Sequence, residues 1–390
     1  MSIGEDAKPI RVFVHLAKDF DARRWERRWA AGDLIGINDR MPYGYFWAEE
    51  DGCTIAYSHS QSKSKIGNLV GSLLKSVTGI DFVHVWQNRK EIYGCDVVWT
   101  HTEIQYLAVL FLFQILFWRR RPKLIAQSVW LFDRWHELTP ARRWILGRLI
   151  AKADILTFLS TENLKAARAI FPNVRSEFVP FGINADKFAP AKEEIVHFPV
   201  HIFSLGNDPH RDWPALILAV KGLKDWELKI ASRKVAANDI GSCSNVEILN
   251  ITSNDQLLAA FDWADMVVVA LKPNLHASGI TVVQEAALRG VAVICTDTGG
   301  LRAYFSDEEV YYVSAGDPSE IQAAIRNLAA DNRRRWKLAA RAQERMMTGG
   351  LNSRSYARRH AELSRELMAR QTPSRLAPNA GETEARQAAD

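Results

Sequence analysis

The chain has 390 residues, of which 47% are hydrophobic, so it is long enough for two domains, or one large domain, with sizeable cores. Lys and Arg (50) barely outnumber Asp and Glu (45), and the net charge of +5 argues against a dedicated nucleic-acid binder. Four scattered cysteines form no CxxC pair, and we expect Cys95 and Cys295 to be reduced core residues. The first residues are polar and the first apolar run is short, which predicts no signal peptide and a cytoplasmic protein.

The first half of the chain alternates predicted strands and helices. Strands are expected at 11–17, 54–58, 96–100, 123–127, 154–159 and 176–180. Helices are expected at 42–50, within 61–77, at 83–92, 104–118 and 139–150, and after the cap at 160–163. Thr139 precedes Pro140, which is the usual arrangement of an N-cap and a first helical residue. Short connections between alternating strands and helices predict a parallel sheet covered on both faces.

Two segments of this half combine basic and aromatic residues. Within 18–40, arginines at 23, 24, 27 and 28 interleave with Trp25 and Trp29, as in a solvated surface helix, a wall of a substrate cleft or a membrane-facing patch. The apolar run 106–118 precedes three arginines, 119–121, and is too short to span a bilayer. We favour a buried helix there; the alternative is an apolar face on the membrane with the arginines on anionic head groups.

Residues 181–197 lose the periodicity and gain proline and charge, which indicates an interdomain linker. The alternation then restarts. Strands are expected at 200–205, 227–231, 246–249, 266–271 and 291–295, and helices at 213–223, 254–263, 279–288, 317–329, 332–347 and 353–368. Residues 371–390 are polar with little apolar content, which predicts a disordered tail.

The helix predicted from Gly279 to Leu288 follows a buried strand and a polar loop, and Gly290 would end it. The first amides of a helix lack internal partners and carry partial positive charge. Ser278 and Gly279 leave room for a phosphate to approach these amides. Glu285, about two turns further on, can accept hydrogen bonds from a diol such as a ribose. The alternative is a helix that only packs on a sheet, with Glu285 solvated.

Two strand–helix domains, the linker sequence VPFGINADKF at 179–188 and the Gly279 helix motif with its following Gly299–Gly300 pair together resemble the retaining GT-B glycosyltransferases, most closely family 4. The likeness covers about residues 95–365 and is strong in the second half. The resemblance implies two Rossmann-like parallel-sheet domains that face a cleft. It implies an acceptor-binding domain at 1–182, a linker at 183–197, a nucleotide-sugar domain at 198–350, a helix at 351–370 that returns to the first domain, and the tail.

The same resemblance assigns roles to residues of the Gly279 motif. Glu285 matches the glutamate that binds the nucleotide ribose, and Ser278, Gly279 and Ile280 match the loop and helix start that hold the donor phosphates. Ala277 stands where the family has an acidic residue that grips the donor sugar, so sugar contacts must come from elsewhere. We take His276 and Asn274 as candidates.

The family also has cations on the diphosphate, after the first strand of the second domain. Here that segment begins Gly206-Asn207 and contains Arg211, whose guanidinium matches phosphate oxygens; the alternative is a surface salt bridge of Arg211 with Asp208 or Asp212. Lys234, or Arg233 beside it, is the second candidate cation.

His101 follows the strand at 96–100, at the sheet edge where ligands bind in such folds, and is the candidate catalytic histidine, although a lone histidine is more often structural. No metal motif is apparent. Asp19-Phe20-Asp21 formally reads DxD, but its many arginine neighbours favour a solvated or salt-bridged pair. We therefore expect a metal-independent protein in which basic groups and helix amides neutralise the leaving diphosphate.

The function implied by the resemblance is transfer, with retention, of a hexose-type sugar from a nucleotide-diphosphate sugar to a glycan or polyprenyl-lipid-linked acceptor. A UDP-sugar is the favoured donor and GDP-mannose the alternative, and peripheral contact with the inner face of the cell membrane is expected. A second hypothesis is a non-catalytic GT-B module that binds a nucleotide or a partner in a glycan-assembly complex. A sugar-nucleotide epimerase lacks its acid–base constellation here, and a Rossmann dehydrogenase lacks GxGxxG after the first strand.

Overall fold

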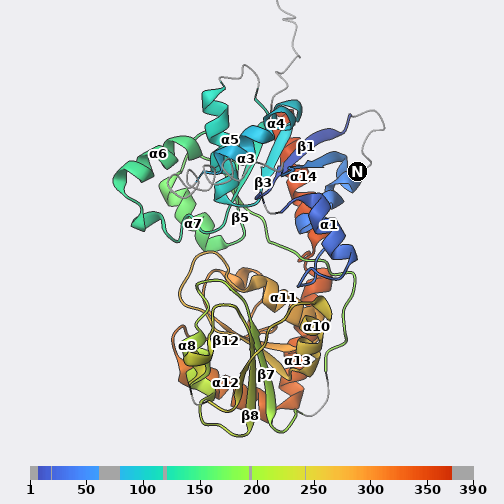
Figure 1. The fold of residues 1–390 in the computed structure, drawn as a ribbon, viewed down its shortest axis with the longest axis vertical. Helices are drawn as coiled ribbons and strands as arrows, with labels where there is room; N and C mark the ends of the chain where they lie inside the picture. Colours follow the sequence, from blue (N-terminus) through green and yellow to red (C-terminus); the bar gives the residue numbers. More distant parts are fainter. Residues whose placement is uncertain are drawn as a thin grey trace, which may run out of the picture.

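The computed structural model describes residues 8–18, 20–60, 80–116, 121–192, 196–241 and 243–370. It shows two α/β domains, one above the other in Figure 1, with the first part of the chain in the upper domain. Buried aliphatic residues fill the sheets of both domains. The prediction of two Rossmann-like domains with parallel sheets is confirmed.

The N-terminal sheet has the order β2-β1-β3-β4-β5-β6, and its neighbouring strands are parallel. Its strands are β1 (Ile10–His15), β2 (Cys53–Tyr57), β3 (Val97–Thr100), β4 (Lys123–Ser128), β5 (Ile155–Phe158) and β6 (Ser176–Phe178). Its helices are α1 (Ala22–Ala30), η1 (Pro42–Asp51), α3 (Phe82–Gln87), α4 (Arg89–Gly94), α5 (Glu103–Ile115), η2 (Trp135–Glu137), α6 (Pro140–Ile150) and α7 (Thr161–Ile170). Thr139 and Ser160 cap α6 and α7, as predicted.

The C-terminal sheet has the order β12-β11-β10-β7-β8-β9 and is also parallel. Its strands are β7 (Val200–Leu205), β8 (Trp226–Ala231), β9 (Val246–Ile248), β10 (Met266–Val269), β11 (Ala292–Thr296) and β12 (Tyr311–Val313). Its helices are α8 (Trp213–Val220), α9 (Ala237–Ile240), α10 (Asn254–Trp263), α11 (Ile280–Leu288), η3 (Leu301–Ala303), α12 (Pro318–Ala330) and α13 (Asn332–Thr348).

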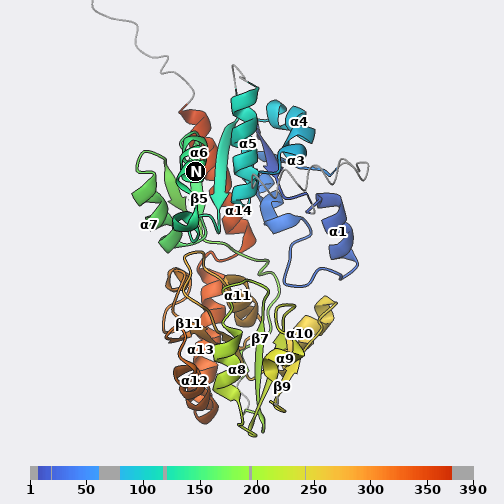
Figure 2. The ribbon, with the colours of Figure 1, turned by 60° about the vertical axis from the view of Figure 1, so that its left-hand side comes forward.

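The last described helix, α14 (Ser353–Ala369), returns to the N-terminal domain, where Figures 1 and 2 show it in red beside the first sheet. Trp99 Nε1 of β3 donates to Ser364 Oγ at 2.9 Å, and the hydroxyls of Tyr45 and Tyr356 are 2.9 Å apart, all of them buried. The two connections between the domains pass so closely that a Cβ on Gly182 would lie 2.3 Å from the backbone of Asn352. The predicted crossing helix is confirmed.

The structure corrects several predicted elements. The single helix expected at 83–92 is two helices, α3 and α4, that meet at Asn88. The amide of buried Asn88 is occupied by backbone groups of His84 and His59, and such side-chain bonds compete with a continuous helix. Strand β12 and the short helix α9 were not expected. The helix predicted within 61–77 and the tail 371–390 lie outside the described residues.

The apolar helix expected at 104–118 is α5 as far as Ile115, and its central residues are buried against the N-terminal sheet. This confirms the favoured interpretation for the described part; residues 117–120 lie outside it. Within the described ranges, no helix combines the length and the apolar character that crossing a bilayer requires.

Candidate active site

The loops that follow β7, β8, β10 and β11 lie at the carboxyl edge of the C-terminal sheet, which faces the N-terminal domain (Figure 1). Ligands bind at this edge in open α/β sheets. The two domains are in contact here. Ser160 Oγ donates to Gly299 O at 2.9 Å, and Tyr304 Oη donates to Leu159 O at 2.6 Å. Of the predicted site residues from the second half of the chain, His276 and Glu285 contact the N-terminal domain directly.

Helix α11 begins at this edge, and its N-cap Gly279 has a φ of 84°, in the left-handed region. A Cβ at this position would lie 2.6 Å from Val269 Cγ1 and 2.9 Å from Arg211 Nη1, so both backbone conformation and space require glycine. Ala277 has a φ of 56°, which is uncommon for a residue with a Cβ. Such strain is typical of functional loops, and here it positions the loop before an open helix N-terminus.

Arg211 is the central cation of this edge. It is 5% exposed, and its Nε and Nη1 atoms have no hydrogen-bond partner in the structure. The guanidinium lies against Gly206, where a Cβ would be 2.4 Å from Nε, and against Gly279. Burial lowers the pKa of Arg211 to about 10, so the side chain is still charged at neutral pH. A buried, charged and incompletely bonded guanidinium at a helix N-terminus is suited to binding an anion.

The alternative for Arg211, a surface salt bridge with Asp208 or Asp212, is wrong. Arg211 is buried, and the ion pairs among the described residues include none with either carboxylate. Asp212 is instead the N-cap of α8 and accepts the amide of Ala215 at 3.2 Å. The side chain of Asp208 is occupied by His210 and His276.

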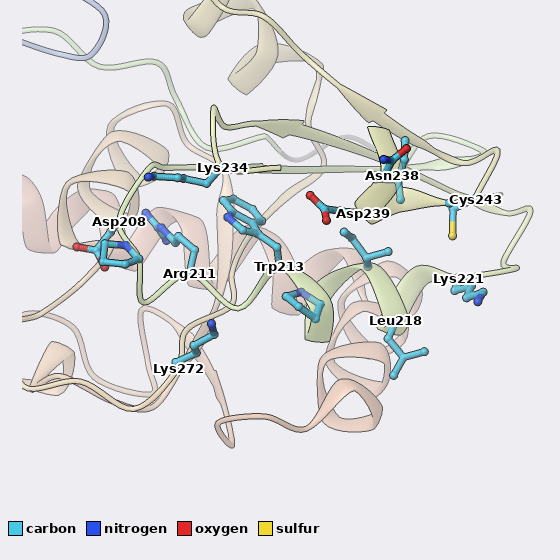
Figure 3. Close-up of a pocket in the computed structure, with 15 residues that line it drawn as sticks. Asp208, Arg211, Trp213, Leu218, Lys221, Lys234, Asn238, Asp239, Cys243 and Lys272 are labelled. Atoms are coloured by element: carbon cyan, nitrogen blue, oxygen red, sulfur yellow. The ribbon is translucent and has the colours of Figure 1, made fainter. Parts of the chain in front are cut away.

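A cavity of about 570 Å³ opens beside Arg211, between α8 and the segment that contains α9. In Figure 3, Lys234 lies above Arg211 and Lys272 below it. Trp213, 7% exposed, also lines this cavity, and its indole Nε1 is buried without a partner. Three cations and unbonded N–H donors make this wall of the site electropositive and suitable for a ligand rich in oxygen atoms.

Lys272 and Trp213 were not singled out from the sequence. Lys272 follows strand β10 by a few residues, and its position after a buried parallel strand was the signal that could have identified it. Arg233, the alternative to Lys234, is exposed, and its backbone amide donates to Asn207 Oδ1 at 2.8 Å. Asn207 thus joins the loops after β7 and β8.

Glu285 lies on α11 and is 7% exposed. Its Oε1 accepts the backbone amide of Ile37, from the N-terminal domain, at 3.0 Å. The neighbouring amide, of Gly36, donates to Asn254 Oδ1 at 3.1 Å, so a loop of the first domain closes over this part of the second. Burial raises the pKa of Glu285 to about 7, although the bond from Ile37 and the charge of Arg211 oppose this. The alternative of a solvated Glu285 is wrong.

His276 joins the two domains rather than standing free. Its Nδ1 lies 3.1 Å from Asp133 Oδ2, in the N-terminal domain, and its Nε2 lies 3.0 Å from Asp208 Oδ2. Burial alone would lower the pKa of His276, but the two carboxylates raise it to about 9. The pKa of Asp208 is held well below its usual range by His276, against the effect of burial. A sugar could reach His276 in this state only by replacing one of these carboxylates.

His101 lies in the N-terminal domain, stacked on Tyr43 with ring centroids 3.4 Å apart. Its Nδ1 is 3.0 Å from Tyr45 Oη and 3.2 Å from Gln127 Nε2. Burial lowers its pKa to about 3, so it is neutral at physiological pH. These contacts make His101 a core histidine that orients its neighbours, and its predicted catalytic role stays a prediction. Asn274 uses its amide within its own loop, with Lys272 and Ser278.

The site therefore brings together an open helix N-terminus, a buried guanidinium with exposed lysines beside it, and a buried carboxylate about two turns along the same helix. These groups can bind a phosphate-containing ligand that also carries vicinal hydroxyls. Of the described DxD residues, Asp21 is occupied as the N-cap of α1 and in accepting the amide of Ser60; Asp19 lies outside the described residues.

Comparison with known proteins finds related sequences and similar folds. Residues 194–364 match the family described as "Glycosyl transferase-like", a range that spans the C-terminal domain and most of α14. The structure resembles sucrose-phosphate synthase from Thermosynechococcus elongatus, with a TM-score of 0.69 and 15% identity over 92% of this chain and 100% of that one. The chain therefore has the GT-B fold that the resemblance implied, and its C-terminal part matches a glycosyl transferase-like family.

Two further relatives are informative. HepE of Anabaena, solved in complex with UDP and glucose, has a TM-score of 0.60 at 15% identity, over 91% of this chain and 99% of that one. The GDP-mannose-dependent alpha-(1-6)-phosphatidylinositol monomannoside mannosyltransferase of Mycolicibacterium smegmatis is 26% identical over 223 residues. That match covers 50% of this chain and 58% of the mannosyltransferase, so it spans less than two thirds of the relative's length.

Proposed function

We propose that the protein transfers a hexose-type sugar from a nucleotide-diphosphate sugar to a glycan or lipid-linked acceptor, with retention of the anomeric configuration. The observation that carries this proposal is the buried, incompletely bonded guanidinium of Arg211 at the N-terminus of α11. A buried charge with unsatisfied N–H donors is unfavourable for folding, and a ligand that supplies phosphate oxygens would explain why it is there.

In the proposed mechanism, the donor diphosphate binds between Arg211, the first amides of α11 and the lysines at 234 and 272. These groups stabilise the negative charge that develops on the leaving nucleoside diphosphate. Glu285 accepts hydrogen bonds from the ribose diol. The backbone amide of Ile37 already donates to Glu285 Oε1, so it either moves away or shares the carboxylate with the ribose. The acceptor hydroxyl then attacks from the face that the leaving group vacates, and no metal ion takes part.

A UDP-sugar is the favoured donor and GDP-mannose the alternative. HepE was solved with UDP-glucose, and the mannosyltransferase relative is named for GDP-mannose, so the comparisons support both. We expect one donor from a panel of UDP- and GDP-sugars, incubated with lipid and glycan extracts, to give a glycosylated product with the donor's anomeric configuration by NMR. Absence of transfer and of slow hydrolysis with every donor would contradict a catalytic function.

The second candidate function is a non-catalytic GT-B module that binds a nucleotide or a protein partner. It is motivated by Ala277, which has a left-handed backbone conformation. The resemblance implies an acidic residue that grips the donor sugar at this position. Nucleotide binding without any turnover in the same panel would favour this function.

We further propose that the acceptor is presented on an anionic membrane, with the N-terminal domain as the contact surface. Helix α1 exposes four arginines, and α6 exposes Arg142, Arg143 and Arg148 together with Trp144, which is 62% exposed, and Ile145, which is 50% exposed. Each basic residue near an anionic surface contributes about 1 kcal/mol, within about one Debye length. The α6 surface was not identified from the sequence.

We expect the protein to co-sediment with phosphatidylglycerol vesicles at low salt and to be released by high salt. Charge reversal of Arg142 and Arg143 should lower the bound fraction severalfold, while reversal of Lys221, on the C-terminal domain, should leave it unchanged. No binding to anionic vesicles at low salt would indicate a soluble acceptor instead.

A further inference from the structure

Asp208, His210 and His276 form a cluster of potential metal-binding side chains at the edge of the proposed donor site. One ligand atom from each, two imidazole nitrogens and a carboxylate oxygen, lie within 4.8 Å of one another. Asp208 and His210 belong to the loop after β7, and His276 to the loop before α11. The sequence did not reveal this group, because its members come from loops 68 residues apart and have no ligand spacing.

Two distances within the group are close to those between the ligands of one metal ion. Asp208 Oδ2 and His276 Nε2 are 3.0 Å apart, and Asp208 Oδ1 and His210 Nδ1 are 3.3 Å apart. Ligand bonds of about 2.0–2.1 Å at a tetrahedral angle place two ligand atoms roughly 3.3 Å apart. Small side-chain adjustments would let the three atoms converge on a single cation.

The orientation of His276 is already fixed in the way that metal-binding histidines require. Its Nδ1 lies 3.1 Å from Asp133 Oδ2, and Asp133 Oδ1 also accepts the backbone amide of Leu275 at 2.5 Å. A carboxylate on the far nitrogen of a ligating histidine fixes the ring and raises its basicity. Nε2 is thereby directed at Asp208.

The group also has an open side. A cavity of about 540 Å³ is lined by Asp133, Asp208 and His210, together with Trp130 and Arg134. The side chains of Asp208 and His210 are 20% and 27% exposed, so a cation has a route to them and water can complete its coordination.

We propose that Asp208, His210 and His276 bind one divalent transition-metal ion, of which Zn²⁺ is the best match, with Asp133 as the orienting carboxylate. Two imidazoles and one carboxylate favour Zn²⁺, Ni²⁺ or Co²⁺ over Mg²⁺ or Ca²⁺, which prefer oxygen ligands. On binding, the cation replaces the proton between His276 and Asp208. Since Asp133 belongs to the other domain, an occupied site also favours the closed arrangement of the two domains.

The other histidine group of the described structure, His197, His201 and Asp265, is less suitable. Both oxygens of Asp265 already accept backbone amides of His197 and His201, and His201 Nδ1 is bonded to Trp263 O at 3.1 Å. This group holds the start of β7 in place, and it supplies a matched control.

The test is calorimetric titration of the metal-free, full-length protein with Zn²⁺, repeated with Co²⁺ and visible absorption to report nitrogen and oxygen ligands. We expect one equivalent to bind to the wild type and to His197→Ala. His210→Ala and Asp208→Asn should each weaken binding at least tenfold, and Asp133→Asn about 10- to 100-fold. Circular dichroism checks that the variants are folded, and His210→Ala removes only a partly exposed side chain.

Three results would overturn the proposal: no Zn²⁺ binding to the wild type, binding that is unaffected by His210→Ala and Asp208→Asn, or binding that is lost in His197→Ala. None of these measurements depends on sugar transfer, so they test the metal site independently of the proposed function.

Discussion

Arg211→Met is expected to stabilise the nucleotide-free protein and to weaken its binding of nucleoside diphosphates strongly. The wild-type guanidinium is charged, 5% exposed and unbonded at Nε and Nη1, so an apolar side chain of similar length relieves an unfavourable burial. Replacement of buried charges by apolar residues is often stabilising, by about 1–4 kcal/mol. Loss of the charged partner should weaken UDP binding by about 2–5 kcal/mol, or roughly 30-fold to several thousandfold.

Thermal unfolding with and without UDP measures both effects. Without UDP, the melting temperature of Arg211→Met should be higher than that of the wild type, and it should rise much less when UDP is added. Arg134→Met is the matched control, because Arg134 is exposed and paired with Glu137 at 2.8 Å, and its loss should change neither quantity much. A destabilised Arg211→Met variant that retains UDP binding would remove Arg211 from the site.

Glu285→Ala should weaken nucleotide binding by about 1.5–3 kcal/mol, the contribution of a hydrogen bond to a charged group. The wild type should also show a pH dependence that this variant lacks. Burial raises the pKa of Glu285 to about 7, so below that pH the carboxyl is protonated and has one oxygen fewer to accept the ribose hydroxyls. UDP affinity should therefore rise between pH 6 and pH 8 and level off above pH 8.

The raised pKa of Glu285 also makes the stability of the folded protein depend on pH. The folded protein holds the Glu285 proton more tightly than the unfolded chain, whose pKa is near 4.5, so this residue's contribution to stability is lost as the pH rises from about 4.5 to 7. Glu285→Gln, which cannot titrate, separates this effect from the titration of the UDP phosphates. Unchanged UDP affinity in folded Glu285→Ala, or the same pH profile in Glu285→Gln, would contradict the assignment.

Local sequence signals were sufficient to predict the helix α11 and the strands on either side of it. The apolar runs of β10 and β11, the glycine at position 279 and the glycine at 290 define a strand, a helix and their ends within one short segment. Arg211 was chosen through the resemblance, which implies a cation on the diphosphate in the segment after the first strand of the second domain.

The remaining features of the site depend on contacts between distant segments. Asp133 and His276 are 143 residues apart in the sequence, and Ile37 and Glu285 are 248 residues apart. Neither contact can therefore be recognised from a local sequence pattern. His101 was chosen from its place after β3, but whether a histidine there reaches solvent or stacks on Tyr43 is decided by packing. The split at Asn88 likewise depends on a bond to His59, on another element.

The central claim is that the α11 edge binds a nucleoside diphosphate, and calorimetric titration of the full-length protein with UDP and with GDP tests it most directly. The account predicts saturable binding of one equivalent of at least one of them, weakened in both Arg211→Met and Glu285→Ala. No heat of binding with either nucleotide up to millimolar concentration, or binding that both substitutions leave unchanged, would contradict it.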